Sequence, residues 1–87
     1  MMLLQQVLRW ESVIMNNYKN GYLYKVGEKI SGIYHGVKYS GIVSNSRQHT
    51  MRIGQTDITV SLTEKIVVYG IERERIIVSI LDDGKEI

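Results

Sequence analysis

The most polar stretch of the chain is residues 44–52, which hold two arginines, a histidine, an asparagine, a glutamine and several hydroxyl side chains but no acid. Side chains of this kind present positive charge and hydrogen-bond donors to phosphate or to an acidic protein surface. We therefore expect Arg47 and Arg52 to pair with phosphate and His49 to donate a hydrogen bond. The alternative is a solvated loop whose charges only keep the protein in solution.

Three further residues are expected to extend this anion-binding site. Lys38 lies in the neighbouring predicted hairpin and adds a positive charge, while Tyr34 and Tyr39 offer rings on which bases stack. Residues 72–75 alternate glutamate and arginine, which is typical of an edge or loop that resists pairing with another strand. Because the formal net charge of the whole chain is only +2, long-range attraction of nucleic acid is expected to be weak.

Catalytic chemistry has few candidate residues in this sequence. His35 and His49 would serve acid–base catalysis or metal binding only if the fold brought them together. Zinc would need further ligands, for which Asp57, Glu28 and Glu64 are the candidates. The sequence has no cysteine, no Gly-x-Ser-x-Gly turn and no glycine-rich phosphate loop. We therefore expect a protein that is not an enzyme and that needs no metal and no cofactor.

The elements that would position these residues begin with an N-terminal helix. Apolar side chains between residues 3 and 18 recur at the spacing of one helical stripe, and Asn20-Gly21 is a typical helix end. The stripe contains Leu3, Val7, Trp10, Ile14 and Tyr18. We expect residues 1–20 to form an amphipathic helix that packs on the rest of the domain. A second possibility is a homodimer contact through Leu3, Val7, Trp10 and Ile14, since so short a chain offers little core to cover this face.

After Gly21 the pattern changes to short apolar runs separated by turns. Isoleucine and valine together supply 21 residues, and alanine and proline are absent, which favours strands over helices. The expected strands are 22–26, 29–35, 39–44, 49–53, 57–62, 65–69 and 76–81, with a turn at Thr63-Glu64. This spacing predicts a small antiparallel SH3-like β-barrel of five to seven strands over residues 21–87, within a single mostly-β domain.

Residues 26–43, with the sequence VGEKISGIYHGVKYSGIV, resemble the opening hairpin of Tudor-like and other SH3-like small barrels. The resemblance implies a binding module for nucleic acid, peptides or partner proteins. Where such barrels carry an aromatic cage, Tyr34 and Tyr39 are the matching positions. Residues 46–51 and 66–70 are also similar to small phage- or plasmid-encoded proteins of unassigned function.

Together these patterns predict a small binding module whose partner is nucleic acid or another phosphate-bearing anion. The alternative is a protein-interaction factor, phage- or plasmid-encoded, that contacts a host protein through the helix face and the strand edges. No apolar run reaches the roughly 18 residues that cross a bilayer. Gln5 and Gln6 interrupt the apolar start of the chain, so it does not read as a signal peptide. We expect a cytoplasmic protein with no membrane contact.

Overall fold

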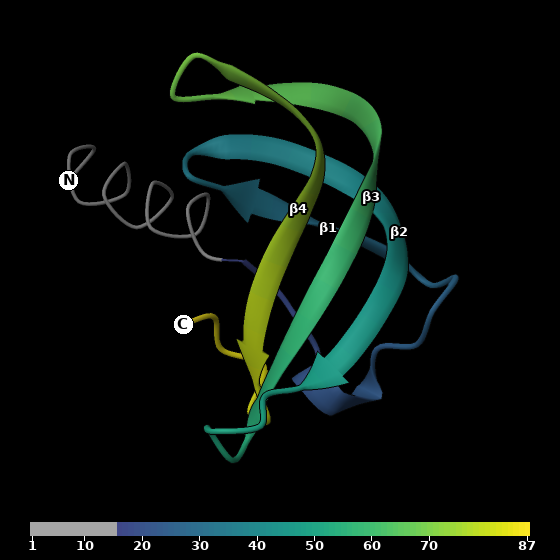
Figure 1. Ribbon diagram of the computed structural model, residues 1–87, viewed down its shortest axis with the longest axis vertical. Helices are drawn as coiled ribbons and strands as arrows, with labels where there is room; N and C mark the ends of the chain where they lie inside the picture. Colours follow the sequence, from purple (N-terminus) through teal and green to yellow (C-terminus); the bar gives the residue numbers. More distant parts are fainter. Residues whose placement is uncertain (1–15) are drawn as a thin grey trace, which may run out of the picture.

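The computed structural model describes residues 16–87, which form one antiparallel β-sheet (Figure 1). The strands are β1 (Lys29–Tyr34), β2 (Val37–Gln48), β3 (Gln55–Val68) and β4 (Ile71–Leu81), and a 3-10 turn, η1 (Gly21–Leu23), precedes them. Each strand pairs with the next one along the chain, so the order in the sheet is β1-β2-β3-β4. Within the described part, no helix is long and apolar enough to cross a membrane.

The predicted SH3-like barrel of five to seven strands is wrong, because residues 16–87 form an open sheet of four strands whose edges are β1 and β4. The predicted strands 57–62 and 65–69 are one strand, since Thr63 and Glu64 lie in a bulge of β3 and not in a turn. Residues 72–75, predicted to be a connection, belong to β4. These residues are exposed on both faces of a hairpin that projects beyond the core, so their charges are compatible with a strand.

Two other predicted strands are not strands in the structure. Residues 22–26 form most of η1 and the loop that follows it, and residues 49–53 belong to the loop between β2 and β3. In that loop Met51 and Ile53 alternate with polar residues as they would in a strand. However, they are 85% and 103% exposed, so the alternation does not reflect a buried face.

The predicted helix over residues 1–20 lies mostly outside the described residues, as do Leu3, Val7, Trp10 and Ile14. Residues 16–20, which the prediction includes, have no regular secondary structure. They run against the sheet, where Tyr18 is buried in the core. Residues 16–20 are therefore part of the same packed unit as the sheet.

The core lies on the inner face of the curved sheet. The register places Val43, Val60 and Ile76 in one row across β2, β3 and β4, and these three side chains are at most 3% exposed. The hydroxyl groups of Tyr18 and Tyr39 share a buried hydrogen bond of 2.6 Å. Burial of this apolar surface is the main favourable contribution to folding.

The two ends of the described chain cover part of the gap between the edge strands. The Asn16 side chain accepts a hydrogen bond from the Ile33 N–H (2.6 Å) and donates one to the Ile33 carbonyl (3.1 Å), on the outer edge of β1. It also donates to Glu86 (2.8 Å). The next residue, Ile87, donates its N–H to the Ser79 carbonyl in β4 (3.2 Å). These contacts satisfy edge groups that would otherwise be open to another strand.

The buried tyrosine pair makes stability depend on pH in the alkaline range. Burial raises the pKa of Tyr39 to about 12 from 10.0, and burial also raises the pKa of Tyr18. In the unfolded chain both phenols ionise near their ordinary pKa, whereas the folded chain retains the protons. The two protonated phenols therefore make their full contribution to the free energy of unfolding below about pH 10. This contribution is lost as pH rises toward 12, by about 1.4 kcal/mol per pH unit for each tyrosine.

Urea unfolding at several pH values in this range measures the effect. Tyr39→Phe should make the fall in unfolding free energy less steep, whereas Tyr69→Phe, which changes a ring that is 83% exposed, should leave the slope unchanged. Equal slopes in the wild type and in Tyr39→Phe would show that the pair does not control the alkaline transition.

Candidate anion-binding groove

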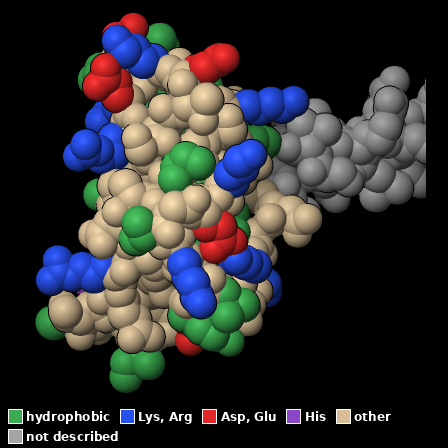
Figure 2. Space-filling model, turned by 90° about the vertical axis from the view of Figure 1, so that its right-hand side faces the viewer, with side chains coloured by type: hydrophobic (Ala, Val, Ile, Leu, Met, Phe, Trp, Pro, Cys, Tyr) green, Lys and Arg blue, Asp and Glu red, His purple; other side chains and the backbone are tan. Residues whose placement is uncertain are grey.

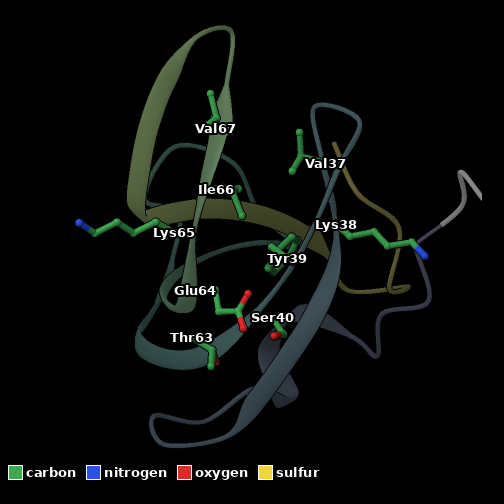
Figure 3. A pocket seen from close by; sticks show the side chains of 9 residues that line it. All are labelled: Val37, Lys38, Tyr39, Ser40, Thr63, Glu64, Lys65, Ile66 and Val67. Carbon is green, nitrogen blue, oxygen red and sulfur yellow. The ribbon is translucent and has the colours of Figure 1, made fainter.

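β2 and β3 pair from their shared loop as far as Gly41 and Leu62, and beyond that point they separate. The first half of β2 then pairs only with β1, and the second half of β3 pairs only with β4, so the two hairpins diverge (Figure 1). The space between them is a cavity of about 660 Å³, which Figure 3 shows from close by. We term it the β2–β3 groove. Its lining consists of Val37, Lys38, Tyr39, Ser40, Thr63, Glu64, Lys65, Ile66 and Val67.

Two local features of the sequence explain this divergence. Gly41 has no side chain, and the backbone of β3 at Ser61 and Leu62 lies where a Cβ atom would be, so the strands approach tightly at the base of the groove. Directly after this point, Ser61 pairs with Arg75 and the next pair is Ile66 with Arg73. Residues 62–65 of β3 therefore lie opposite Glu74 alone in β4. Extra residues in one strand bend it and increase its twist. The bulge therefore turns the second half of β3 away from β2.

The walls of the groove present backbone groups that have no partner in the sheet. Both hairpins close on two-residue turns in which every residue has a positive φ, and such turns close on a hydrogen-bonded pair. In an antiparallel pair of strands, every second residue bonds to the partner strand and the residues between them point their N–H and C=O away from it. Counted from the β1–β2 turn, Lys38 and Ser40 are the residues of β2 that point these groups away from β1 and into the groove. The same alternation leaves those of Val67 facing the groove from β3.

Hydroxyl and ammonium groups accompany these backbone donors. Ser40 and Thr63 line the base of the groove, while Lys38 and Lys65 extend from its walls toward opposite sides (Figure 3). A second cavity of about 430 Å³, to which Lys29 contributes, continues from the groove and shares Ser40 and Thr63 with it. The two cavities form one hollow with a lysine on each side and hydroxyls where they meet.

The lysines around the groove differ in how far their charge is compensated. Lys65 is shared between Glu72 (3.6 Å) and Glu74 (3.3 Å) on β4. Lys29 and Lys38 form no ion pair with any residue between 16 and 87. These two exposed ammonium groups therefore offer uncompensated positive charge beside the hydroxyls.

The outer face of the sheet continues this positive region. The register places Lys29 and Arg75 in one row across the four strands, with Ile42 and Ser61 between them. On the face of the molecule in Figure 2, Lys and Arg side chains are spread widely, whereas several Asp and Glu side chains gather at the upper end and others lie near the middle and at the bottom. An anion on this face would meet several positive side chains between these acids.

The structure separates the residues that the sequence placed in one anion-binding site. Lys38 and Tyr39 line the β2–β3 groove. Tyr39 is only 5% exposed and its hydroxyl bonds to Tyr18, so this residue belongs to the floor of the groove and offers no free stacking face. Tyr34 lies beside the β1–β2 turn, with its ring 4.4 Å from that of His35. These three predicted residues therefore do not form one surface.

Arg47, His49 and Arg52 lie at the other end of β2, where the fold adds an acid to them. Arg47 is opposite Asp57 in the register of β2 and β3. A hydrogen bond from the Gln55 side chain (3.0 Å) holds the pKa of Asp57 below its usual value. The charges of His49 and Arg52 act in the same direction. The carboxylate is thus ionised and compensates part of the positive charge of this loop.

The two histidines lie at opposite ends of β2, so the structure does not bring them together. Of the predicted zinc ligands, Glu28 pairs with Lys19, Asp57 lies beside Arg47, and Glu64 lines the β2–β3 groove. In the described part of the chain, no three His, Asp or Glu side chains lie close enough to hold a metal ion.

The residues that the β3 bulge contributes to the groove were not predicted as site residues. Thr63 and Glu64 were predicted to form a turn, and Lys65 to begin a separate strand. The available signal was the lack of glycine, proline, asparagine and aspartate between residues 62 and 66. A tight turn usually needs one of these residues, whereas a bulge does not.

Comparisons of the chain with protein-family models, with curated proteins and with solved structures find no match. The geometry and charge of the β2–β3 groove are therefore the features from which a function can be inferred.

Proposed function

We propose that this chain is a non-enzymatic binding module whose β2–β3 groove holds a single strand of nucleic acid through its phosphates. Phosphate oxygens in protein complexes are bound by lysine and arginine, by serine and threonine hydroxyls and by backbone N–H groups. The groove offers all of these: free backbone donors at Lys38 and Ser40, hydroxyls at Ser40 and Thr63, and the ammonium groups of Lys29 and Lys38. This combination in one hollow is the observation that carries the proposal.

The size of the groove favours a single strand over a duplex. A volume of about 660 Å³ is typical of sites that enclose one small ligand. We expect it to hold a short stretch of single strand, and the adjoining cavity beside Lys29 gives the strand a path onto the outer face. A duplex would contact the lysine side chains and could not reach the backbone donors within the groove.

The salt dependence of binding tests this proposal. Fluorescence anisotropy of a short labelled oligonucleotide should show an affinity that falls steadily between about 50 and 200 mM salt. If about three phosphates are neutralised, the logarithm of the binding constant should fall with the logarithm of salt concentration with a slope of about −2. An affinity that does not change with salt would contradict phosphate binding.

The alternative predicted from the sequence, a protein-interaction factor, is favoured by one feature of the same groove. The N–H and C=O groups of Lys38, Ser40 and Val67 are of the kind with which an extended peptide pairs when it adds a strand to a sheet. Such binding depends on main-chain hydrogen bonds and changes little with salt. A peptide ligand of this kind would therefore differ from nucleic acid in the same titration.

A further inference from the structure

Among residues 16–87, Glu64 is the one acidic residue that lines the β2–β3 groove. Its side chain is exposed and points into the space between the two strands, whereas Lys38 and Lys65 point outward on opposite sides (Figure 3). Its carboxylate has no ion pair and no hydrogen bond with any residue between 16 and 87. Glu72 and Glu74 lie outside the groove and pair with Lys65.

A free carboxylate in this position works against a ligand that presents only phosphate oxygens, because like charges repel. It favours a ligand that places a hydrogen-bond donor between its phosphates. A strand of RNA has this pattern, since each ribose carries a 2′-hydroxyl that both donates and accepts hydrogen bonds. DNA has the same phosphates and lacks that hydroxyl. The hydroxyl groups of Ser40 and Thr63, which line the groove with Glu64, can also form hydrogen bonds with the ribose 2′-hydroxyl.

We propose that the β2–β3 groove selects RNA over DNA, with Glu64 accepting a hydrogen bond from a ribose 2′-hydroxyl and Ser40 and Thr63 contacting the sugar and phosphate next to it. This inference rests on the proposed function, because the lysines and backbone donors supply the affinity common to both nucleic acids. Glu64 supplies the difference between them. With DNA, the Glu64 carboxylate only repels the phosphates. With RNA, a hydrogen bond from the 2′-hydroxyl to the charged carboxylate offsets this repulsion.

The test compares RNA and DNA oligonucleotides of one sequence made only of adenine and cytosine, so that the two ligands differ only in the sugar. Anisotropy titrations should show that the wild type binds the RNA about tenfold more tightly, as expected for one hydrogen bond to a charged group. Glu64→Ala should bring the two affinities together, chiefly because DNA binds more tightly. Glu64→Gln retains an acceptor oxygen, so both ligands should bind more tightly and a preference for RNA should remain.

Glu74→Ala is the matched control, because it also removes one exposed acid from this region but lies outside the groove. It should raise both affinities by a similar factor and leave the preference unchanged. Both glutamates are exposed, so the melting temperatures of the variants should equal that of the wild type.

The possible failures separate the two levels of the proposal. If the wild type binds neither oligonucleotide, the proposed function itself is overturned. If it binds both equally, or binds DNA more tightly, the groove holds phosphate but does not select RNA. A preference for RNA that survives in Glu64→Ala would overturn the role assigned to Glu64.

Discussion

Replacement of Gly41 by alanine is expected to lower the free energy of unfolding by about 3 kcal/mol. A Cβ atom at this position would lie 2.7 Å from Val60 Cγ1 and 3.0 Å from Leu62 Cα, and it would press against the carbonyl oxygen of Ser61. Two of these three contacts are with backbone atoms of β3, which is hydrogen-bonded to β2 at this point. Neither strand can move aside without loss of ladder bonds.

Urea unfolding measures this effect, with Gly36→Asn as the control. Gly36 has a φ of +81°, and a Cβ atom added there would meet no other atom within 4 Å. Asparagine tolerates this backbone conformation. The control should therefore change the unfolding free energy by much less than Gly41→Ala. A Gly41→Ala variant as stable as the wild type would mean that β2 and β3 do not approach closely at the base of the groove.

The hairpin of β1 and β2 could be predicted from the sequence, and so could the alternation in the first half of β3. Gly36 marks the first turn, and Ile58, Val60 and Leu62 alternate with polar residues as a strand with one buried face requires. These signals are local. Too many strands were predicted because the polar residues 63–64 lie within one strand and because the segments 22–26 and 49–53 are not strands. The start of β4 was placed too late, since residues 72–75 belong to that strand.

The candidate site could be predicted only in part, because a groove between two strands depends on where their pairing stops. Lys38 was recognised from its charge and its place beside a turn. Lys38 lies across the groove from Thr63 and Glu64 because of the bulge in β3. Such a bulge could not be placed from the sequence, and a shift of register by one residue moves every side chain of a strand to the other face. The proximity of Asp57 to Arg47 has the same origin, since only the pairing of β2 with β3 reveals it.

Removal of two lysines beside the groove should weaken nucleic-acid binding about 10- to 100-fold at low salt, because two phosphate contacts are lost. The variant is Lys29→Ala with Lys38→Ala. Its matched control is Arg47→Ala with Arg52→Ala, which removes the same charge from the other end of β2. The control should have a much smaller effect, since Asp57 already compensates part of the charge of that loop.

All four side chains are exposed, so neither double variant should change the melting temperature. Any difference in binding then reflects the position of the charges, because the net charge of the two variants is equal.

The salt dependence of binding for these two double variants tests the account most directly. Loss of two phosphate contacts to a single strand should make the slope less steep by about 1.4 for the lysine pair. The slope of the arginine pair should stay close to that of the wild type. Equal changes in both variants, or a larger change in the arginine pair, would show that the ligand does not bind in the β2–β3 groove.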